Sequence, residues 1–306
     1  MIDSVEKIWL DGEIVPWNDA HVHILTHSLH YGVGAFEGIR AYQRADGNSY
    51  VFMLHEHIKR LFDTCKLVLI QPRFTRDQIA RACVETLQIN AMTEGYLRPL
   101  IFVGEGAMGL YAPENRMRAG IIAWRWNAYL GEEALQNGIR CKISSFARPP
   151  VNASLAKAKM MGQYTNSALA HREARFGGYD EAILLDSSGF VSEGAGENIF
   201  LVKRGVLHTP DLASSILEGI TREVVMTLAR ESGLEVREER ITRDQLWLAD
   251  ECFFTGTAAQ ITPVREVDDR SIGDGKVGPI TSMLQERFFN IVRGADTSHG
   301  EWLTPV

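Results

Sequence analysis

The stretch Ser192-Glu-Gly-Ala-Gly-Glu-Asn198 sets two carboxylates among glycines in the second half of the chain. An apolar run at 181–186 precedes it and another at 199–202 follows it, which predicts a tight turn between two buried strands. Glycine allows a backbone to approach a bound group closely, and such turns often carry functional side chains. We therefore expect one of these carboxylates to face a ligand.

A carboxylate placed beside a ring nitrogen keeps that nitrogen protonated. Pyridoxal phosphate enzymes need this service, because a protonated pyridine draws electrons out of the substrate. The turn thus favours pyridoxal 5'-phosphate as the cofactor. A chain of this kind must also supply a lysine for the cofactor aldehyde and donors for its phosphate.

The bulk properties are those of a globular protein. The 306 residues exceed one comfortable core, so one large domain or two smaller ones are expected. A net charge of -7 without a lysine or arginine run argues against nucleic-acid binding. The acidic segment 1–6 is not typical of a signal peptide, and no apolar stretch reaches the length of a membrane span. The four scattered cysteines are typical of buried, reduced thiols, so we expect a cytoplasmic protein.

Local patterns predict the elements of the first half. Thr75 and Gln78 have the spacing of a capping box that opens a helix. Pro99 lies within a predicted strand, which we therefore expect at a sheet edge. The predicted elements are a hairpin over 8–15 with Asp11-Gly12 as its turn, helices over 55–69 and from 75, and strands over 96–103 and 119–124.

The polar stretch 127–137 separates two halves of different character. We take it as a linker between a small N-terminal α/β domain, 1–126, and a large C-terminal domain, 138–306. Strands and helices interleave in both, which favours a two-domain α/β (α+β) enzyme. The elements predicted after the linker are strands over 140–144, 181–186, 199–202 and 251–255, and helices over 163–175, 220–234 and 281–292.

Two lysines are candidates for covalent catalysis. Lys157 and Lys159 lie among small and apolar residues in Ala153-Ser-Leu-Ala-Lys-Ala-Lys-Met-Met-Gly-Gln-Tyr164. Such surroundings desolvate an amine and favour the neutral form that attacks a cofactor aldehyde. Two surface lysines on a loop are the alternative interpretation.

Three segments are candidates for phosphate binding. Leu217-Glu-Gly-Ile-Thr-Arg222 puts a glycine and a threonine at a predicted helix start, where free N–H groups and the helix dipole favour an anion. Thr255-Gly-Thr-Ala-Ala259 is a hydroxyl-rich turn after a strand, and Arg60 lies on a predicted helix as a further donor. Taken singly, each also has a structural explanation as a helix cap, a turn or a solvated charge.

Taken together, these segments resemble the branched-chain aminotransferases of the class IV, fold type IV pyridoxal phosphate enzymes. The resemblance extends from about residue 7 to about residue 292 and rests on motifs in the family's order. The matching residues are His30-Tyr-Gly32 with Phe36-Glu-Gly-Ile-Arg-Ala-Tyr42, Tyr96-Leu-Arg-Pro99, Lys159 through Gly162 with Tyr164, Ser192 through Asn198, Pro210 through Thr221, and Thr255 through Ala259 with Ile261-Thr-Pro-Val264.

The resemblance implies a two-domain fold with the cofactor at the domain interface. It makes Lys159 the Schiff-base lysine and the proton shuttle. It places Glu193 against the pyridine nitrogen and Tyr164 against the phenolic oxygen of the ring. The remaining cofactor contacts that it implies, mostly to the phosphate, are Arg60, Leu217, Ile220, Thr221, Gly256 and Thr257.

The resemblance also implies a substrate pocket. Tyr96 and Arg98 lie two apart on a strand and so share a face; with the N–H groups of Thr257 and Ala258 they would bind the substrate carboxylate. An apolar wall would discriminate weakly among valine, leucine and isoleucine, because one methylene is worth only ~1–3 kcal/mol. Met160 and Met161, where many relatives carry smaller residues, would narrow or soften it. The wall would consist of Tyr31, Phe36, Trp126 and Tyr129.

Two patterns suggest other chemistry. Gly104-Glu-Gly-Ala-Met-Gly109 has the glycine spacing of a dinucleotide site, but Leu110-Tyr-Ala-Pro113 is a poor start for the helix that such a site needs. The resemblance makes it a loop over a neighbouring subunit's pocket. Imidazoles at short spacing suggest zinc, which would make the protein a metal-dependent hydrolase, but no carboxylate-rich motif accompanies them, so no metal is expected. These histidines are His21, His23, His27, His30, His55 and His57.

We therefore expect reversible transamination between branched-chain L-amino acids (Leu, Ile, Val) and 2-oxoglutarate, giving branched-chain 2-oxo acids and L-glutamate. The alternative is a D-amino acid or (R)-amine transaminase of the same fold, with an aminodeoxychorismate lyase as a further relative. A non-catalytic binding module is disfavoured because Lys159 and Glu193 are both present. By analogy with the family, the functional unit is a homodimer or a higher homo-oligomer, such as a hexamer.

Overall fold

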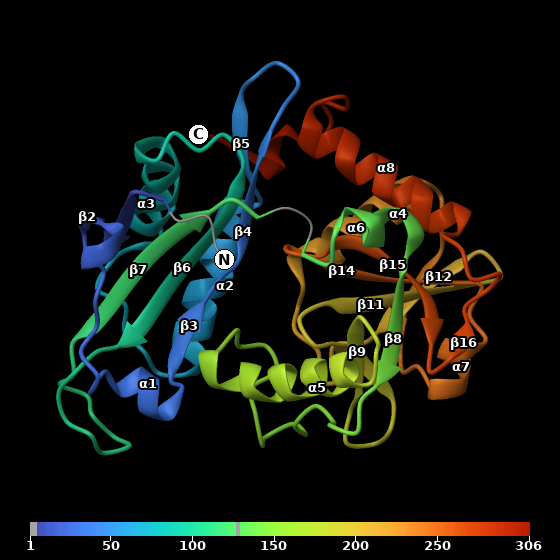
Figure 1. The fold of residues 1–306 in the computed structure, drawn as a ribbon, viewed down its shortest axis with the longest axis horizontal. Coiled ribbons are helices and arrows are strands. Elements are labelled where there is room, and N and C mark those ends of the chain that lie inside the picture. Colours follow the sequence, from blue (N-terminus) through green and yellow to red (C-terminus); the bar gives the residue numbers. More distant parts are fainter. Residues whose placement is uncertain (1–4, 127–128) are drawn as a thin grey trace. The chain divides into compact units, whose positions relative to one another are not determined.

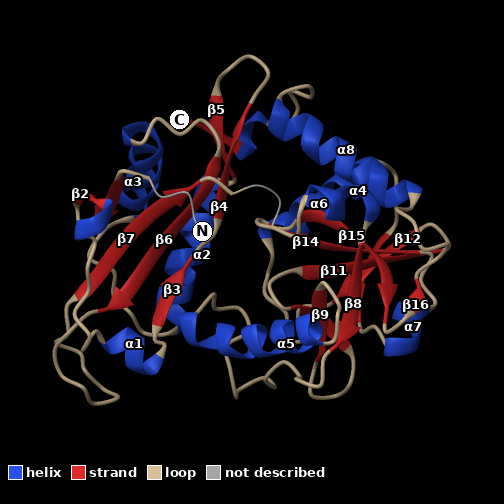
Figure 2. Ribbon diagram, viewed as in Figure 1, coloured by secondary structure: helices blue, strands red, loops and turns tan. Residues whose placement is uncertain are grey.

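The computed structural model describes residues 5–126 and 129–306, which form two compact units (Figure 1). Unit 1 comprises Met1–Trp126, Ala158–Gln163 and Ile291–Val306, and unit 2 comprises Asn127–Lys157 and Tyr164–Asn290. Each unit combines a β-sheet with helices, as Figure 2 shows, which confirms the predicted mixed α/β fold class. The expected linker begins with residues 127 and 128, which lie outside the described residues, and its last part forms helix α4 (Glu132–Asn137). The expected domain limits stay a prediction.

The sheet of unit 1 has the strand order β17-β5-β4-β6-β7-β1-β2 in the described residues, and β3 also pairs with β6. The predicted hairpin is present as β1 and β2. Its turn residues, Asp11 and Gly12, both have positive φ, as a tight hairpin turn requires. The strands are β1 (Lys7–Leu10), β2 (Glu13–Pro16), β3 (Gly34–Phe36), β4 (Ile39–Gln43), β5 (Ser49–Phe52), β6 (Gly95–Val103), β7 (Met117–Trp124) and β17 (Leu303–Pro305).

Pro99 does not mark a sheet edge, so this expectation was wrong. Strand β6, which contains it, is paired on both sides, with β7 on one side and with β3 and β4 on the other. Between β3 and β4 the pairing is interrupted at Glu37 and Gly38, opposite Pro99. There the Glu37 N–H donates to the Pro99 carbonyl at 3.0 Å. A proline is tolerated in this central strand because the interruption removes the need for its missing N–H.

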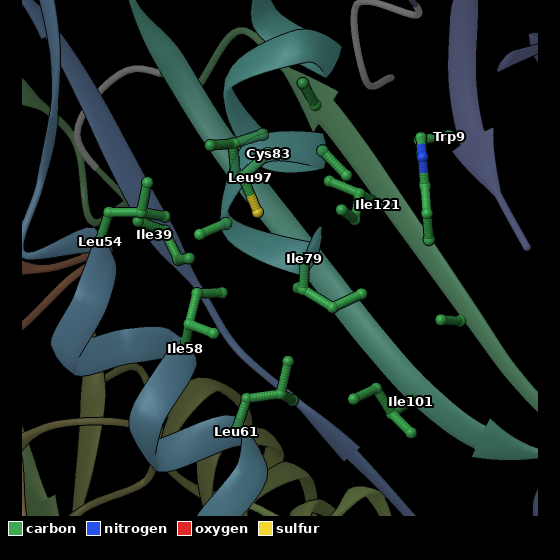
Figure 3. Close-up of a cluster of buried hydrophobic side chains, with 14 of the residues drawn as sticks. Trp9, Ile39, Leu54, Ile58, Leu61, Ile79, Cys83, Leu97, Ile101 and Ile121 are labelled. Carbon is green, nitrogen blue, oxygen red and sulfur yellow. The ribbon is translucent and has the colours of Figure 1, made fainter. Parts of the chain in front are cut away.

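Helices α2 (Leu54–Leu67) and α3 (Arg76–Ile89) supply the apolar side chains that cover the sheet of unit 1. The predicted capping box at α3 is confirmed, because the Gln78 N–H donates to the Thr75 hydroxyl at 3.2 Å and the Thr75 N–H donates to the Gln78 side chain at 2.8 Å. Figure 3 shows Leu61 of α2 and Ile79 of α3 in one buried cluster with sheet residues such as Leu97. Full burial of such a side chain contributes roughly 1.5–3 kcal/mol to folding. The short helix α1 (His27–Tyr31) precedes β3.

The sheet of unit 2 has the order β10-β9-β8-β15-β14-β11-β12-β13 in the described residues, and β16 pairs with β15. It is mixed, since β8 runs parallel to β9 and β15, and β12 runs parallel to β13. The strands are β8 (Ile139–Ile143), β9 (Glu181–Leu185), β10 (Val191–Gly194), β11 (Asn198–Lys203), β12 (Val206–Pro210), β13 (Val236–Glu239), β14 (Glu251–Gly256), β15 (Gln260–Val267) and β16 (Arg270–Ser271).

The helices predicted over 163–175, 220–234 and 281–292 are present within a few residues, whereas α4 and α7 (Arg243–Trp247) were not predicted. Helices of unit 2 pack on the sheet, α5 against β8 and β9, α6 against β14, and α4 against β15. All four cysteines of the chain are free and buried, as expected. No helix in the described residues is long and apolar enough to cross a membrane. The helices are α5 (Tyr164–Phe176), α6 (Ile220–Glu231), α7 (Arg243–Trp247) and α8 (Pro279–Arg293), the last of which ends in unit 1.

Candidate active site

Lys159 is held against strand β3 by its backbone. Its N–H donates to the Thr64 hydroxyl at 2.9 Å, and its carbonyl accepts the Phe36 N–H at 3.2 Å. Close backbone packing follows three residues later, where the Gly162 N–H donates to the Gly32 carbonyl at 2.9 Å. A Cβ added to Gly32 would lie 2.8 Å from the Gly162 Cα, so only glycine fits there. The backbone position of Lys159 is therefore set by its hydrogen bond to β3 and by the nearby contact between Gly32 and Gly162.

The expected substrate residues of unit 1 meet around one aromatic ring. The Lys159 Nζ lies 5.0 Å from the centre of the Phe36 ring, and the Arg98 guanidinium carbon lies 4.8 Å from the same centre. Arg98 also lies 5.6 Å from the Tyr96 ring, which contacts Trp126 edge to face at 4.8 Å. The arrangement combines an amine, a cation and an apolar wall. It can hold a molecule that carries an amino group, a carboxylate and an apolar side chain.

Gly38 makes room for this group. A Cβ at this position would lie 1.7 Å from the Tyr96 hydroxyl oxygen, so any side chain there would displace the tyrosine. The Phe36-Glu-Gly38 stretch therefore supplies the ring, a buried acid and the space above Tyr96 in three consecutive residues.

Tyr31 is not part of the cluster around Phe36 as the described contacts define it. Its hydroxyl donates to the Met108 carbonyl at 2.6 Å, and its side chain is exposed. The loop 104–116 that it contacts links β6 to β7 without a helix, which agrees with the expectation that the glycine spacing there is no dinucleotide site. The structure thus places Tyr31 at the surface of unit 1.

Arg60, the expected phosphate ligand, forms a fork with a buried acid. Its Nε donates to Glu37 Oε1 at 2.7 Å, and its Nη2 donates to Oε2 at 3.0 Å. His57 Nδ1 lies 2.7 Å from the same Oε2. Burial opposes ionisation of Glu37, but the charge of Arg60 and then His57 outweigh it and hold the pKa of Glu37 far below its usual range. The acid is therefore ionised. Burial lowers the pKa of His57, although the neighbouring carboxylate of Glu37 acts in the opposite direction, and Nδ1 of the ring donates to that carboxylate.

Glu193 lies at the predicted turn in unit 2. Strand β10 bulges just before it, and the Gly194 N–H donates to the Glu197 carbonyl at 2.7 Å, which closes the tight turn to β11. Its Oε2 accepts the Leu217 N–H at 3.0 Å and the Asn198 side-chain N–H at 3.2 Å. These bonds hold a nearly buried carboxylate in one orientation.

Arg148 completes the support of Glu193. Its Nε lies 3.0 Å from Glu193 Oε1. Its other nitrogens donate to the Ser167 hydroxyl and to the Gly194 carbonyl, each at 2.9 Å. Sequence reasoning missed this arginine, because no local pattern in the loop after β8 distinguishes it from a solvated charge.

The expected phosphate segments of unit 2 lie beside Glu193. Helix α6 begins at Ile220 and Thr221 without a side-chain cap on its first turn. A Cβ on its N-cap residue, Gly219, would lie 1.8 Å from the Asn198 side-chain oxygen. The turn 257–259, with Thr257 and Ala258, joins β14 to β15, and Gly256 at its start lies against the 194–197 turn. The fold therefore brings Leu217, Gly219 and Gly256, each from one of the expected phosphate segments, against the 193–198 turn.

Three further candidate residues belong to unit 2. Tyr164 is the first residue of α5, the helix whose Ser167 contacts Arg148. Lys157, the second candidate lysine, donates to the Leu212 carbonyl at 2.6 Å and to the Ile216 carbonyl at 2.8 Å. Burial lowers its pKa. Its amine thus anchors the loop before α6. Tyr129 is described but belongs to no helix or strand.

A second buried acid, Glu197, lies near Glu193. Burial raises its pKa well above the usual range, and the charge of buried Glu181 adds to this effect. His171 Nδ1 lies 2.9 Å from Glu181 Oε1. Glu181, Glu193 and Glu197 are therefore buried acids of unit 2 with different partners.

The clustered histidines have hydrogen-bond partners of other kinds. His27 Nε2 and His30 Nε2 each lie 2.9 Å from a backbone carbonyl, of Gly109 and Ile24. Within the described residues, no group of three or more His, Cys, Asp or Glu side chains could hold a metal ion.

Comparisons with known proteins identify the family of the chain. The family model described as Amino-transferase class IV matches residues 34–267. A branched-chain-amino-acid aminotransferase of Pseudomonas aeruginosa is 49% identical over 306 residues, covering 100% of this chain and 99% of that protein. The crystal structure of the Escherichia coli branched-chain amino acid aminotransferase matches with a TM-score of 0.96 at 45% identity, over 98% of this chain and 99% of that one.

A second solved structure carries the expected cofactor. The branched-chain amino acid aminotransferase of Thermobaculum terrenum, solved in its PLP form, matches with a TM-score of 0.92 at 36% identity, over 99% of both chains. Similarity of this extent shows that the chain belongs to the class IV aminotransferases and, within them, to the branched-chain amino acid aminotransferases of fold type IV.

Proposed function

We propose that this chain catalyses reversible transamination between branched-chain L-amino acids (leucine, isoleucine and valine) and 2-oxoglutarate, giving branched-chain 2-oxo acids and L-glutamate. The observation that carries the proposal is the shared ring of Phe36, against which both Lys159 and Arg98 lie. An amine for the chemistry and a cation for a carboxylate at one apolar wall match the three parts of a branched-chain amino acid.

The cofactor is pyridoxal 5'-phosphate, and the donor set of the chain fits it. When bound, it supplies the electron sink that accepts the electron pair left behind as the substrate loses its α-proton. Glu193, an acceptor held by Asn198 and Leu217, would keep the ring nitrogen protonated. The uncapped first turn of α6 offers N–H groups for a phosphate. We assign Tyr164 to the phenolic oxygen, Leu217 and Gly256 to the remaining contacts, and Arg60, Ile220, Thr221 and Thr257 to the phosphate.

Lys159 is assigned as the base. Its Nζ would take the proton from the α-carbon of the amino acid and, in the opposite half-reaction, return a proton to the α-carbon of the 2-oxoglutarate skeleton. The hydrogen bonds of its N–H to Thr64 and of its carbonyl to the Phe36 N–H fix the backbone from which the amine works. Positioning of this kind is a large part of what an enzyme adds to a proton transfer.

Arg98 would bind the substrate carboxylate, assisted by the N–H groups of Thr257 and Ala258. Phe36, Tyr96 and Trp126, with Tyr31 and Tyr129, would form the apolar wall. Because a methylene is worth only ~1–3 kcal/mol in such a pocket, we expect all three branched-chain substrates to react.

The functional unit is proposed to be a homodimer or a higher homo-oligomer. Unit 1 exposes an apolar surface on two segments that lie side by side, since the His27 ring hydrogen-bonds the Gly109 carbonyl. Ile24 is 74% exposed, Leu110 85% and Tyr111 86%. Exposed apolar side chains gathered in this way are typical of a protein interface. Light scattering that gives the mass of a monomer for the active enzyme would contradict this proposal. We also propose the domains 1–126 and 138–306 and a cytoplasmic location.

A substrate panel tests the function. Leucine, isoleucine, valine, D-alanine and (R)-1-phenylethylamine would each be offered with 2-oxoglutarate, and glutamate formation measured. We expect turnover of the three branched-chain L-amino acids and little of the other two. Preferential use of D-alanine or of the amine would replace the proposal by the D-amino acid or (R)-amine alternative.

A further inference from the structure

We propose that Glu37 and His57 are positioning residues that fix the guanidinium of Arg60 for a phosphate of the cofactor. The inference rests on the proposed assignment of Arg60 to that phosphate. Neither residue was predicted as a site residue, and both are too deeply buried to touch a ligand, with 0% of Glu37 exposed. Arg60 keeps 13% of its side chain exposed. The exposed member of the group is therefore the cation.

The geometry of the group is that of a clamp. Glu37 accepts from Arg60 Nε at 2.7 Å, from Arg60 Nη2 at 3.0 Å, from His57 Nδ1 at 2.7 Å and from the Gly38 N–H at 3.2 Å. A two-point fork fixes the plane of a guanidinium as well as its position. The fork engages the guanidinium through Nε and Nη2, which sets the plane in which all its donors lie.

The clamp is tied to the catalytic lysine through the chain itself. Glu37 follows Phe36, whose N–H donates to the Lys159 carbonyl at 3.2 Å. Arg60 and His57 lie on helix α2, which also carries Thr64, the acceptor of the Lys159 N–H. The same two elements thus hold the amine by its backbone and the guanidinium by its side chain. We infer that Glu37 sets the position of the guanidinium relative to the amine.

The chemistry requires an acid at position 37. Every polar neighbour of Glu37 in these contacts is a donor, and an ionised carboxylate only accepts. A glutamine would turn its NH₂ group toward one of these donors, which would push Arg60 or His57 away. The buried charge pair also makes removal of either partner costly, since the remaining charge would be unpaired. Glu37→Gln keeps the shape, removes the charge and replaces one of the two acceptor oxygens by a donor.

The test compares two ligands that differ only in the phosphate. Dissociation constants of pyridoxal 5'-phosphate and of pyridoxal would be measured for the full-length apoenzyme by spectroscopic titration. The ratio of the dissociation constant of pyridoxal to that of pyridoxal 5'-phosphate reports how much affinity the phosphate contributes, independently of turnover. We expect Arg60→Ala to lower the ratio most, while the N–H groups at the start of α6 still hold part of the phosphate. Glu37→Gln should lower it about tenfold, and His57→Leu about threefold, because the guanidinium loses its preset position.

Asp11→Asn is the matched control. Asp11 is also a largely buried acid of unit 1 that accepts from an arginine Nε, that of Arg118, at 2.7 Å. Loss of this contact should lower the thermal midpoint without changing the ligand ratio. A double variant, Glu37→Gln with Arg60→Ala, should show no further fall in the ratio beyond Arg60→Ala alone. Should Glu37→Gln fail to fold, Glu37→Asp and His57→Leu give the same reading.

The outcomes separate the two claims. If Arg60→Ala lowers the ratio but Glu37→Gln and His57→Leu leave it unchanged or raise it, the clamp is wrong and the phosphate assignment stands. If Arg60→Ala leaves the ratio unchanged, the phosphate assignment is wrong, and the clamp is wrong with it.

Discussion

The chain contains two buried carboxylate–arginine contacts whose proposed roles are reversed. In unit 1 the acid, Glu37, is fully buried and supports an arginine, Arg60, that is proposed to bind the phosphate of the cofactor. In unit 2 the arginine, Arg148, supports an acid, Glu193, that is proposed to face the ring nitrogen. The surroundings of the two carboxylates differ. Glu37 accepts hydrogen bonds from Arg60 and His57 in a fully buried position, whereas Glu193 lies at a turn rich in glycine. The same kind of ion pair can therefore serve either charge, and its neighbours rather than burial alone decide which, since Arg148 and Glu193 keep 11% and 9% of their side chains exposed.

Replacement of Lys159 should have the largest effect on turnover, and the effects of changes at the two carboxylate–arginine contacts are compared with it. Lys159→Ala should lower turnover of leucine by about 10⁴-fold or more, because it removes both the base and the covalent attachment of the cofactor. The visible absorption band of the bound cofactor should shift or disappear. Lys157→Ala is the control; it should keep the band and most activity, since its amine holds backbone carbonyls. Full activity of Lys159→Ala would make Lys157 the catalytic lysine.

The unit 2 contact is tested by changing its acid and its arginine separately. Glu193→Gln should lower kcat by about 10²–10³-fold, because the ring nitrogen would lose the charge that keeps it protonated. Arg148→Ala should have a smaller effect on kcat, since Asn198 and the Leu217 N–H still hold the acid. Steady-state kinetics with leucine measures both. An Arg148→Ala effect larger than that of Glu193→Gln would reverse the proposed division of roles in this pair.

Arg98 offers a comparison with an arginine that has no acid in its described contacts. Arg98→Ala should raise KM for leucine about 10–100-fold with a smaller effect on the cofactor band, because the lost interaction is with the substrate carboxylate. A KM change of the same size for an amine without a carboxylate would show that Arg98 acts on the pocket as a whole.

The smallest expected effect is on stability. Glu37 of unit 1 and Glu197 of unit 2 should change the stability of the fold with pH in opposite directions. The pKa of Glu37 is depressed in the folded state, so its contribution to stability is present above the unfolded pKa of about 4.3 and lost as pH falls. The pKa of Glu197 is raised, mainly by burial, so this acid reduces stability increasingly as pH rises above about 4.3 toward its folded pKa. Glu197→Gln should therefore raise the thermal midpoint, and the gain should be larger at pH 8 than at pH 5. A gain that is the same at both values would contradict this.

The sequence by itself determined the features that depend only on residues close together in the chain. The hairpin at Asp11-Gly12, the capping box at Thr75 and the turn after Glu193 follow from local conformational preference, and all three are present. The order of the motifs was also sufficient to predict the family, the fold class and the cofactor. These features need no knowledge of which distant segments meet.

Only the tertiary structure decided which charges are paired and which strands are central. The pairing of Arg60 with Glu37 depends on how α2 packs against the β3–β4 junction, and that of Arg148 with Glu193 on how the loop after β8 passes the turn. Pro99 was misplaced for the same reason, since the interruption beside it belongs to another strand. The physical cause is that burial and strand register arise from contacts between segments far apart in the chain. No residue carries such a contact in its own local pattern.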